Sequence, residues 1–194
     1  ERTRGVLERL RNTLGEIPLL FTFRTSGEGG EKEIDVPADV SLNESAARSG
    51  MADLVDVEAF TESGAAEKII EEAHSAGVRV IASNHDFYKT PSREEIISRL
   101  VKMQDMGADI AKIAVMPQSR KDVLTLLAAT EEIVSGHAQI PVITMSMGAL
   151  GAISRVCGEV FGSAVTFGAV GRGSAPGQLG AGELETVLSI LHNR

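Results

Sequence analysis

Short apolar runs alternate with longer amphipathic segments along this chain. The apolar runs have the length and the Val, Ile and Ala content of buried β-strands, whereas the longer segments place their apolar residues at helical spacing. A glycine closes each of five helical segments, as expected where a helix ends in the left-handed conformation: Gly15, Gly50, Gly77, Gly107 and Gly136. These glycines recur about every 30 residues, which is the length of a unit of one strand and one helix.

The pattern predicts strands at residues 18–24, 53–58, 78–84, 109–116, 141–147 and 164–170. It predicts helices at residues 2–14, 39–49, 65–76, 92–106, 121–135, 153–160 and 183–192. Strands that alternate with helices form parallel β-structure, so the fold class is α/β, either an open sheet or a (β/α)8 barrel. A barrel needs eight strands and typically about 250 residues. A barrel without its first two strand–helix units would have about the length of this chain.

Composition and charge narrow the possible partners. Of the 194 residues, 43% are hydrophobic, as in a globular protein. The net charge of −8 argues against a nucleic-acid partner, and no apolar run approaches the roughly 20 residues that span a bilayer. The single cysteine, Cys157, excludes an internal disulfide and a cysteine zinc site, which fits a reducing, cytoplasmic location. Because the chain starts at Glu1 rather than at a methionine, we expect it to be incomplete at the N-terminus.

Lys112 lies inside the apolar strand predicted at 109–116. Alternation along that strand places Ile110, Lys112 and Ala114 on one face. An ammonium that loses its water there is disfavoured relative to the neutral amine, which is a nucleophile for ketones and aldehydes. Lys112 is therefore a candidate for Schiff-base formation. For a lone lysine, a buried ion pair or a side chain that reaches solvent is the commoner explanation.

Other polar residues fall at the carboxyl ends of predicted strands or just beyond them, where a barrel collects its active site. They are Arg24, Glu28, Asp56, Glu58, His85, Ser174 and Gln178. The last two lie in a stretch rich in Gly, Ser and Pro, residues 168–182, that reads as a mobile loop.

Each of these residues also has a structural interpretation. Arg24 could form a surface ion pair, but arginine suits the recognition of a substrate carboxylate. Asp56 and Glu58 could equally neutralise buried cations or serve the site. His85 could be a histidine held in a turn. Arg155 starts a predicted helix, where a cation gains nothing from the helix dipole, and this favours a ligand role.

Glycines 27, 29 and 30 follow the first predicted strand and resemble a phosphate-binding nest. The pattern is weak, since no helix start is predicted directly after it.

Five short motifs occur in order along the chain: Phe21-Thr22-Phe23-Arg24 with Glu28-Gly29-Gly30, Ser83-Asn84-His85-Asp86-Phe87, Ala111-Lys112-Ile113-Ala114-Val115-Met116-Pro117, Ile153-Ser154-Arg155 and Ser174-Ala175-Pro176-Gly177-Gln178. In order and spacing these motifs resemble type I 3-dehydroquinate dehydratase, and the resemblance covers essentially all 194 residues. It implies a (β/α)8 TIM barrel, usually a homodimer, that dehydrates 3-dehydroquinate to 3-dehydroshikimate in the shikimate pathway, without a metal or other cofactor.

The resemblance also implies a role for each site residue. Lys112 is similar to the lysine that forms the Schiff base, His85 to the general acid/base, and Glu28 to the carboxylate that orients this histidine. Arg155 is similar to the arginine that holds the substrate carboxylate. Three further residues are similar to contacts with substrate hydroxyl and carboxylate groups: Arg24, Ser174 and Gln178.

One feature of the family has no counterpart in this chain, a Glu-x-Arg motif on an N-terminal strand. Residues 1–194 are therefore expected to form a single (β/α) barrel domain that is incomplete at its N-terminus.

Two other functions compete with the dehydratase. A class I aldolase also uses a barrel lysine, and residues 171–174, Gly-Arg-Gly-Ser, could serve as its phosphate site. A barrel without its first strands could instead be an inactive binding module.

Overall fold

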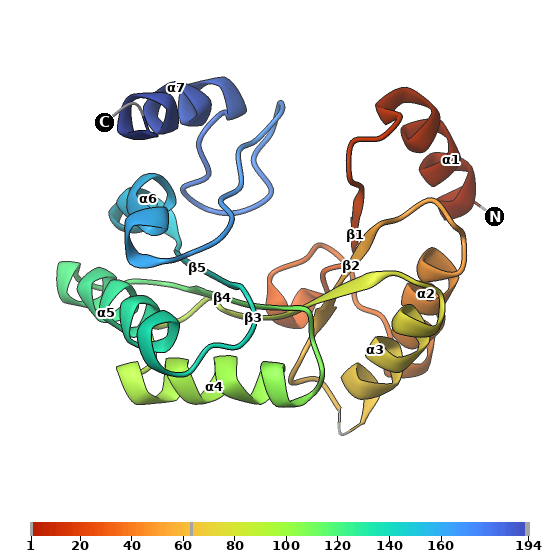
Figure 1. The fold of residues 1–194 in the computed structure, drawn as a ribbon, viewed down its shortest axis with the longest axis horizontal. Helices are drawn as coiled ribbons and strands as arrows, with labels where there is room; N and C mark the ends of the chain where they lie inside the picture. The colour runs from red at the N-terminus through yellow and green to blue at the C-terminus, as the bar shows by residue number, and fades with distance from the viewer. Residues whose placement is uncertain (1, 63, 193–194) are drawn as a thin grey trace. The chain divides into compact units, whose positions relative to one another are not determined.

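A computed structural model describes residues 2–62 and 64–192. Over these residues helices and strands alternate along the chain (Figure 1). The strands are β1 (Leu20–Thr22), β2 (Leu54–Glu58), β3 (Arg79–Asp86), β4 (Ile110–Val115) and β5 (Val142–Ser146). The α-helices are α1 (Arg2–Leu14), α2 (Val36–Ala47), α3 (Ala65–Ser75), α4 (Arg93–Asp105), α5 (Arg120–Gly136), α6 (Gly148–Cys157) and α7 (Ala181–His192), and two short 3₁₀ helices are η1 (Ser26–Glu28) and η2 (Gly158–Phe161).

The strands form one sheet in the order β1-β2-β3-β4-β5. Its pairs β1–β2 and β2–β3 are parallel, with Leu54 paired to Leu20 on one side and to Arg79 on the other. Each strand lies beside the next one along the chain, with a helix in the connection, which is the winding of a (β/α) barrel. The predicted α/β class is confirmed. Within the described residues the sheet runs from β1 to β5 and is not closed.

The strand predicted at residues 164–170 is wrong. Ala164 donates one backbone hydrogen bond to Val142, and Ala169 forms an isolated bridge with Gly180, but no ladder follows. Val170 is 93% exposed. An alternating apolar pattern becomes a strand only where a neighbouring strand accepts and donates along its length, and this segment has no such neighbour among the described residues.

Helix α6 begins at Gly148, five residues before its predicted start. The sequence there is rich in glycine, which is unfavourable inside a helix and hides its first turn from a pattern-based prediction. Gly151 is needed because a Cβ at this position would lie 2.3 Å from the backbone of Ser146, so glycine lets α6 pack closely against β5. Arg155 consequently lies in the last turn of α6 and not in the first, which corrects its predicted position.

Four of the five glycines predicted to close helices are confirmed by positive φ angles: Gly15, Gly50, Gly77 and Gly107. The fifth prediction is wrong, because Gly136 is the last residue of α5 and the helix cap is His137.

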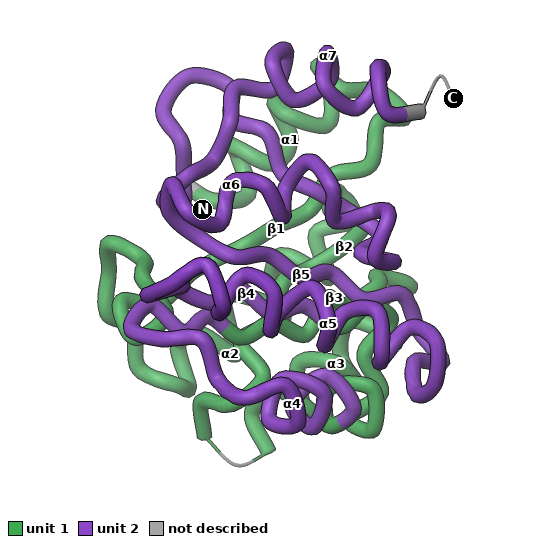
Figure 2. Tube along the Cα trace, turned by 90° about the vertical axis from the view of Figure 1, so that its left-hand side faces the viewer, with its two compact units in different colours: residues 1–84, 102–111 green, residues 85–101, 112–194 purple. Residues whose placement is uncertain are grey.

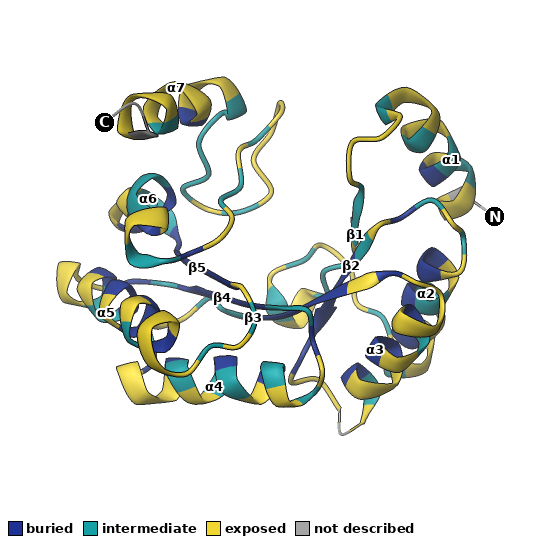
Figure 3. Ribbon diagram, in the orientation of Figure 1, coloured by how far each residue is buried: buried dark blue, intermediate teal, exposed yellow. Residues whose placement is uncertain are grey.

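The chain folds as two compact units (Figure 2). Unit 1 comprises residues 1–84 and 102–111, and unit 2 comprises residues 85–101 and 112–194. In unit 1, Val55 and Val57 of β2 belong to a hydrophobic cluster with Ile69 and Ile70 of α3. In unit 2, fully buried side chains come from α4, β4, α5 and β5, for example Ile96, Ile113, Leu126 and Ile143. Figure 3 shows buried residues along β2 to β5, whereas β1 has none.

Candidate active site

Arg24 is the centre of a charged cluster in unit 1. It lies two residues beyond β1, and its side chain is 16% exposed. Its guanidinium donates to Asp56 at 2.5 Å and to Glu58 at 3.2 Å. It also donates to the Ser83 hydroxyl at 3.0 Å and forms an ion pair with Glu28 at 3.5 Å. One cation is thus shared by three carboxylates.

Two of these carboxylates belong to β2. Because Val55 and Val57 point into the hydrophobic cluster, alternation places Asp56 and Glu58 on the opposite face of the strand. Both are buried, and both form ion pairs with Arg24, as expected of carboxylates that neutralise a cation. One carboxylate is sufficient to neutralise one arginine, however, and this cluster has three.

Burial and charge move the pKa values of this cluster in defined directions. Burial by itself lowers the pKa of Arg24, but the nearby carboxylates, first Asp56, outweigh it and raise that pKa above its ordinary value. The pKa of Glu58 is raised, chiefly because burial disfavours its charged form. The Glu28 charge acts in the same direction, against the hydrogen bonds from Thr25 and the charge of Arg24.

Glu28 ends η1, the turn that follows β1. Its carboxylate accepts a hydrogen bond from the Asn84 amide at 2.9 Å, in addition to its ion pair with Arg24. The glycines beside it close the turn: the Gly30 N–H donates to the Thr25 carbonyl at 2.8 Å, and the Gly29 N–H donates to Ser26. These two N–H groups are used within the turn and are not available to bind a phosphate.

Lys112 is the main candidate in unit 2. It lies in the middle of β4 and is 7% exposed, as its strand pattern predicted. Its ammonium nitrogen lies 4.9 Å from the centroid of the Phe167 ring. An aromatic face attracts a cation and also shields it from water, so Phe167 forms part of the environment of this amine.

His85 lies near the end of β3, and its side chain is half-buried. The prediction that it lies at the carboxyl end of a strand is confirmed, although it belongs to the strand itself and not to a turn after it.

Arg155 is a buried cation without a carboxylate partner among the described residues. Its guanidinium contacts the Met145 sulfur at 3.6 Å and donates to the Pro176 carbonyl at 3.3 Å. Its Nε is buried and has no hydrogen-bond partner within the described residues. Burial lowers the pKa of Arg155. A buried guanidinium with unused donors is suited to bind an anion.

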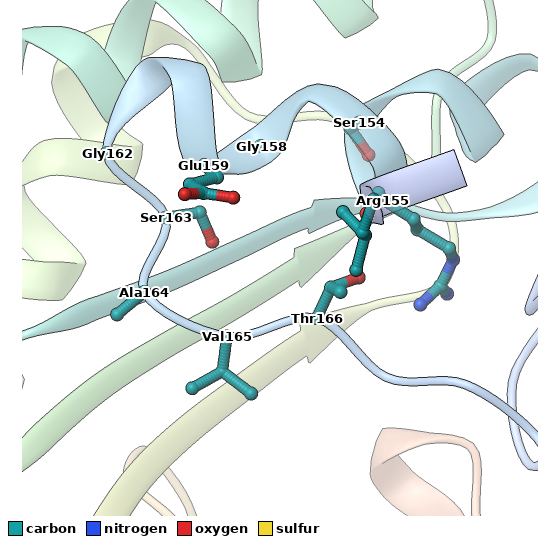
Figure 4. A pocket seen from close by; sticks show the side chains of 10 residues that line it. Ser154, Arg155, Gly158, Glu159, Gly162, Ser163, Ala164, Val165 and Thr166 are labelled. Carbon is teal, nitrogen blue, oxygen red and sulfur yellow. The ribbon is translucent and has the colours of Figure 1, made fainter. Parts of the chain in front are cut away.

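A pocket of about 470 Å³ lies beside Arg155 in unit 2 (Figure 4). Glu159 and Ser163 line one part of it, and Figure 4 shows the Arg155 guanidinium pointing away from both. The Arg155 guanidinium is therefore not directed at these two side chains.

Ser174 and Gln178 lie together in the predicted loop. The Gln178 amide oxygen accepts from the Ser174 backbone N–H at 2.7 Å and from its hydroxyl at 3.1 Å. The loop approaches the start of α6 so closely that a Cβ on Gly177 would lie 2.3 Å from the Gly148 carbonyl oxygen. In this conformation the two polar side chains bind each other.

The predicted site residues therefore fall into two sets. Arg24 and Glu28 meet in unit 1, whereas unit 2 holds the five others: His85, Lys112, Arg155, Ser174 and Gln178. Sequence reasoning gave no role to Thr25, Ser83, Asn84 or Phe167. Thr25 follows Arg24 in the sequence, and Ser83 and Asn84 precede His85. This proximity to predicted site residues was the only sequence signal that pointed to them.

No group of three or more His, Cys, Asp or Glu side chains in the described parts of the chain is arranged to hold a metal ion. Among these same residues, no helix is both long and apolar enough to cross a membrane.

The family model for type I 3-dehydroquinase matches residues 2–194. The chain belongs to this family. It is 55% identical over 187 residues to a 3-dehydroquinate dehydratase of Klebsiella pneumoniae strain 342, a match that covers 96% of this chain and 74% of that protein. It is 56% identical over 183 residues to a 3-dehydroquinate dehydratase of Escherichia coli O1:K1, which covers 94% of this chain and 73% of that protein.

Solved structures agree with this family. The type I 3-dehydroquinate dehydratase of Clostridium difficile, crystallised with covalently modified comenic acid, is 52% identical with a TM-score of 0.95, and the match covers 98% of this chain and 75% of that one. The 3-dehydroquinate dehydratase of Geobacillus kaustophilus is 43% identical with a TM-score of 0.95, covering 99% of this chain and 74% of that one. The resemblance predicted from the five motifs is confirmed, and the family match favours a dehydratase over a class I aldolase.

Proposed function

We propose that this chain dehydrates 3-dehydroquinate to 3-dehydroshikimate through an imine on Lys112. The observation that carries the proposal is the burial of Lys112 on β4, against Phe167, in a member of the type I 3-dehydroquinase family. A lysine amine is a nucleophile, and a ketone is the group with which it forms an imine.

The chemical difficulty lies in removing a proton from the carbon beside the substrate ketone. Lys112 attacks the ketone carbon, and loss of one water gives an iminium that accepts the electron pair of the neighbouring C–H bond. His85 takes that proton, since an imidazole takes up and releases protons near neutral pH. The resulting enamine expels the β-hydroxyl, which leaves as water after His85 protonates it. A second water then hydrolyses the conjugated iminium, which frees the product and Lys112.

Charged residues are proposed to bind the substrate and to orient the groups that react with it. Arg155, which has no carboxylate partner among the described residues, is proposed to bind the substrate carboxylate. Glu28 is proposed as the carboxylate that orients His85.

Arg24 is proposed to contact the substrate as well. Its guanidinium has five N–H groups, of which three donate to its carboxylate and serine partners, and the others would contact the substrate. Ser174 and Gln178 are proposed to exchange their mutual hydrogen bonds for substrate contacts as the loop closes.

Borohydride trapping tests this function. Borohydride added together with 3-dehydroquinate should reduce the imine and fix the ligand mass on Lys112, as read by peptide mass spectrometry. The Lys112→Arg variant, which keeps the charge but forms no imine, should remain unlabelled. Label on a different lysine, or no label in the presence of turnover, would reject the proposed chemistry.

We also propose that the residues belong to one barrel domain and that the protein is a homodimer in the cytoplasm. The sequential strand order supports a single domain. A single cooperative unfolding transition and a dimeric mass in sedimentation would agree with these proposals, and two separate transitions or a monomeric mass would contradict them. Cell fractionation tests the location.

A further inference from the structure

Glu58, the last residue of β2, uses both of its carboxylate oxygens on the turn that carries Glu28. Its Oε1 accepts from the Thr25 backbone N–H at 2.7 Å, and its Oε2 accepts from the Thr25 hydroxyl at 2.8 Å. The Glu58 side chain is 2% exposed. These bonds fix Thr25 through its main chain and its side chain at once.

Thr25 in turn fixes the geometry of η1. It is the N-cap residue of η1, and its carbonyl accepts from the N–H groups of Glu28 and Gly30. Gly30 returns so close that a Cβ there would lie 1.8 Å from the Arg24 carbonyl oxygen. The turn is therefore closed around Thr25, and a displacement of Thr25 displaces Glu28 with it.

A second connection runs through Arg24. Glu58 accepts from the Arg24 guanidinium at 3.2 Å, and the same nitrogen of Arg24 lies 3.5 Å from the Glu28 carboxylate. Glu58 thus acts on the backbone position of Glu28 through Thr25, and on its carboxylate through Arg24. On its other oxygen the Glu28 carboxylate accepts from the Asn84 amide.

Neutralising Arg24 does not account for Glu58. Asp56 already binds that guanidinium, at the shorter distance of 2.5 Å. The burial of a second carboxylate opposes its ionisation, and the pKa of Glu58 is raised accordingly. A neutral residue of the same shape would meet the hydrogen-bonding needs of Thr25 without that penalty.

We propose that Glu58 is a positioning residue, which holds the Thr25–Glu28 turn so that the Glu28 carboxylate is in place for the dehydration. This inference rests on the proposed function, in which Glu28 serves the reaction, and it assigns a purpose to a buried acid that touches no reacting atom in that mechanism.

The test compares Glu58→Gln with Glu58→Ala. Glutamine keeps acceptors and donors for Thr25 but loses the charge that binds Arg24, whereas alanine removes both connections. We expect kcat to fall about 10-fold in Glu58→Gln and about 10²-fold in Glu58→Ala, the scale of a misplacement near 1 Å, with KM changed by less than about 3-fold. The acid limb of the kcat–pH profile should shift in the same direction as in Glu28→Gln.

A double-variant cycle separates positioning from general support of the fold. In the Glu28→Gln background, the further change Glu58→Gln should cost less than about 2-fold, because the group that Glu58 positions has already been altered. An equal loss in both backgrounds, or no loss in either, would overturn the proposal.

Hydrogen exchange provides a readout that does not depend on activity. The Gly30 N–H, which closes the turn on Thr25, should exchange faster in Glu58→Ala than in the wild-type protein, while amides in α5 stay unchanged. Unchanged exchange at Gly30 overturns the positioning role even if turnover falls. Absence of turnover and of trapped imine in the wild-type chain would instead reject the proposed function, and with it the catalytic purpose of the turn.

Discussion

The two ends of the β1–β2 pair in unit 1 are built from the same parts. At the amino end, Asp53 accepts the Leu19 backbone N–H at 2.6 Å and pairs with Arg11. At the carboxyl end, Glu58 accepts the Thr25 backbone N–H at 2.7 Å and pairs with Arg24. In each case a carboxylate of β2, or of the residue before it, ties down the chain next to β1 with the help of an arginine.

The surroundings of the two carboxylates differ. The Asp53 side chain is 49% exposed, and the hydrogen bond from Leu19 is the main cause of its lowered pKa. The Glu58 side chain is 2% exposed, and burial raises its pKa. Arg11 completes its hydrogen bonding with backbone carbonyls such as those of Met51 and Gly15, whereas Arg24 is surrounded by acids.

Of the two ends of these strands, the amino end is the one that favours stability. At the amino end, Asp53 and Arg11 pair with each other and with backbone groups, which favours the folded state. At the carboxyl end, three carboxylates compete for one buried cation, an arrangement that costs stability. In (β/α) folds the carboxyl ends of the strands carry the chemistry, and residues there are selected for reactivity at the expense of packing.

Replacing two histidines, one near the carboxyl end of a strand and one that contacts the amino end of another strand, should give the largest contrast. His85→Ala, near the carboxyl end of β3, should lower kcat by about 10² to 10⁴-fold, because a positioned acid/base contributes that much. His74→Ala is the matched control: His74 contacts Asp109 at 2.9 Å, just before β4, and its loss should leave kcat unchanged. Steady-state kinetics with 3-dehydroquinate measure both variants. Near-normal turnover in His85→Ala would remove this residue from the mechanism.

The same glycine-to-alanine change at each end should give the next contrast. Gly30→Ala forces a methyl group against the Arg24 carbonyl, so the Glu28 turn must open, and kcat should fall by about 10²-fold. Gly15→Ala, before β1, meets open space but holds alanine at a φ of 59°, which should cost about 1 kcal/mol of stability and no activity. Chemical denaturation and kcat are measured on both. If Gly30→Ala kept full activity, the turn geometry would not matter to the reaction.

The smallest expected effect concerns stability and its dependence on pH. Asp53→Asn should lower the free energy of unfolding at pH 7 by about 1 kcal/mol, the scale of a hydrogen bond to a half-exposed charge, and leave kcat unchanged. The pKa of Asp53 is lower in the folded state than in the unfolded state, where it is near 3.8. The contribution of Asp53 to the stability of the fold is therefore present above pH 3.8 and is lost as the pH falls through the lower pKa of the folded state. Asp53→Asn should therefore lose less stability than the wild type on acidification below about pH 4.

The sign is opposite at Glu58. A carboxyl group whose pKa is raised on folding contributes most to stability when the pH is below its pKa in the unfolded state. This contribution to stability is lost as the pH rises through its pKa in the folded state. Urea unfolding of Asp53→Asn between pH 3 and 7, with Glu58→Gln in parallel, distinguishes the two ends. If both variants showed the same pH dependence, the contrast between the two ends would be wrong.

Local sequence patterns were sufficient to predict the order of the strands and helices. Apolar periodicity identified the five strands of the sheet, and glycine at Gly15, Gly50, Gly77 and Gly107 marked helix ends, because both signals act over a few residues of backbone. The burial of Lys112 followed from the same local alternation. The motifs around these elements were sufficient to identify the family.

Which charged side chains pair with each other depends on the tertiary fold. Glu58 accepts a hydrogen bond from Thr25, which is 33 residues away in the sequence, and Asn84 donates one to Glu28, which is 56 residues away. No local sequence pattern encodes such pairs. The segment 164–170 has the composition of a strand, yet it forms none, because a strand also requires a backbone partner along its length. Arg155 was predicted in the first turn of a helix but lies in the last turn of α6, because the close packing of Gly151 on Ser146 determines where that helix begins.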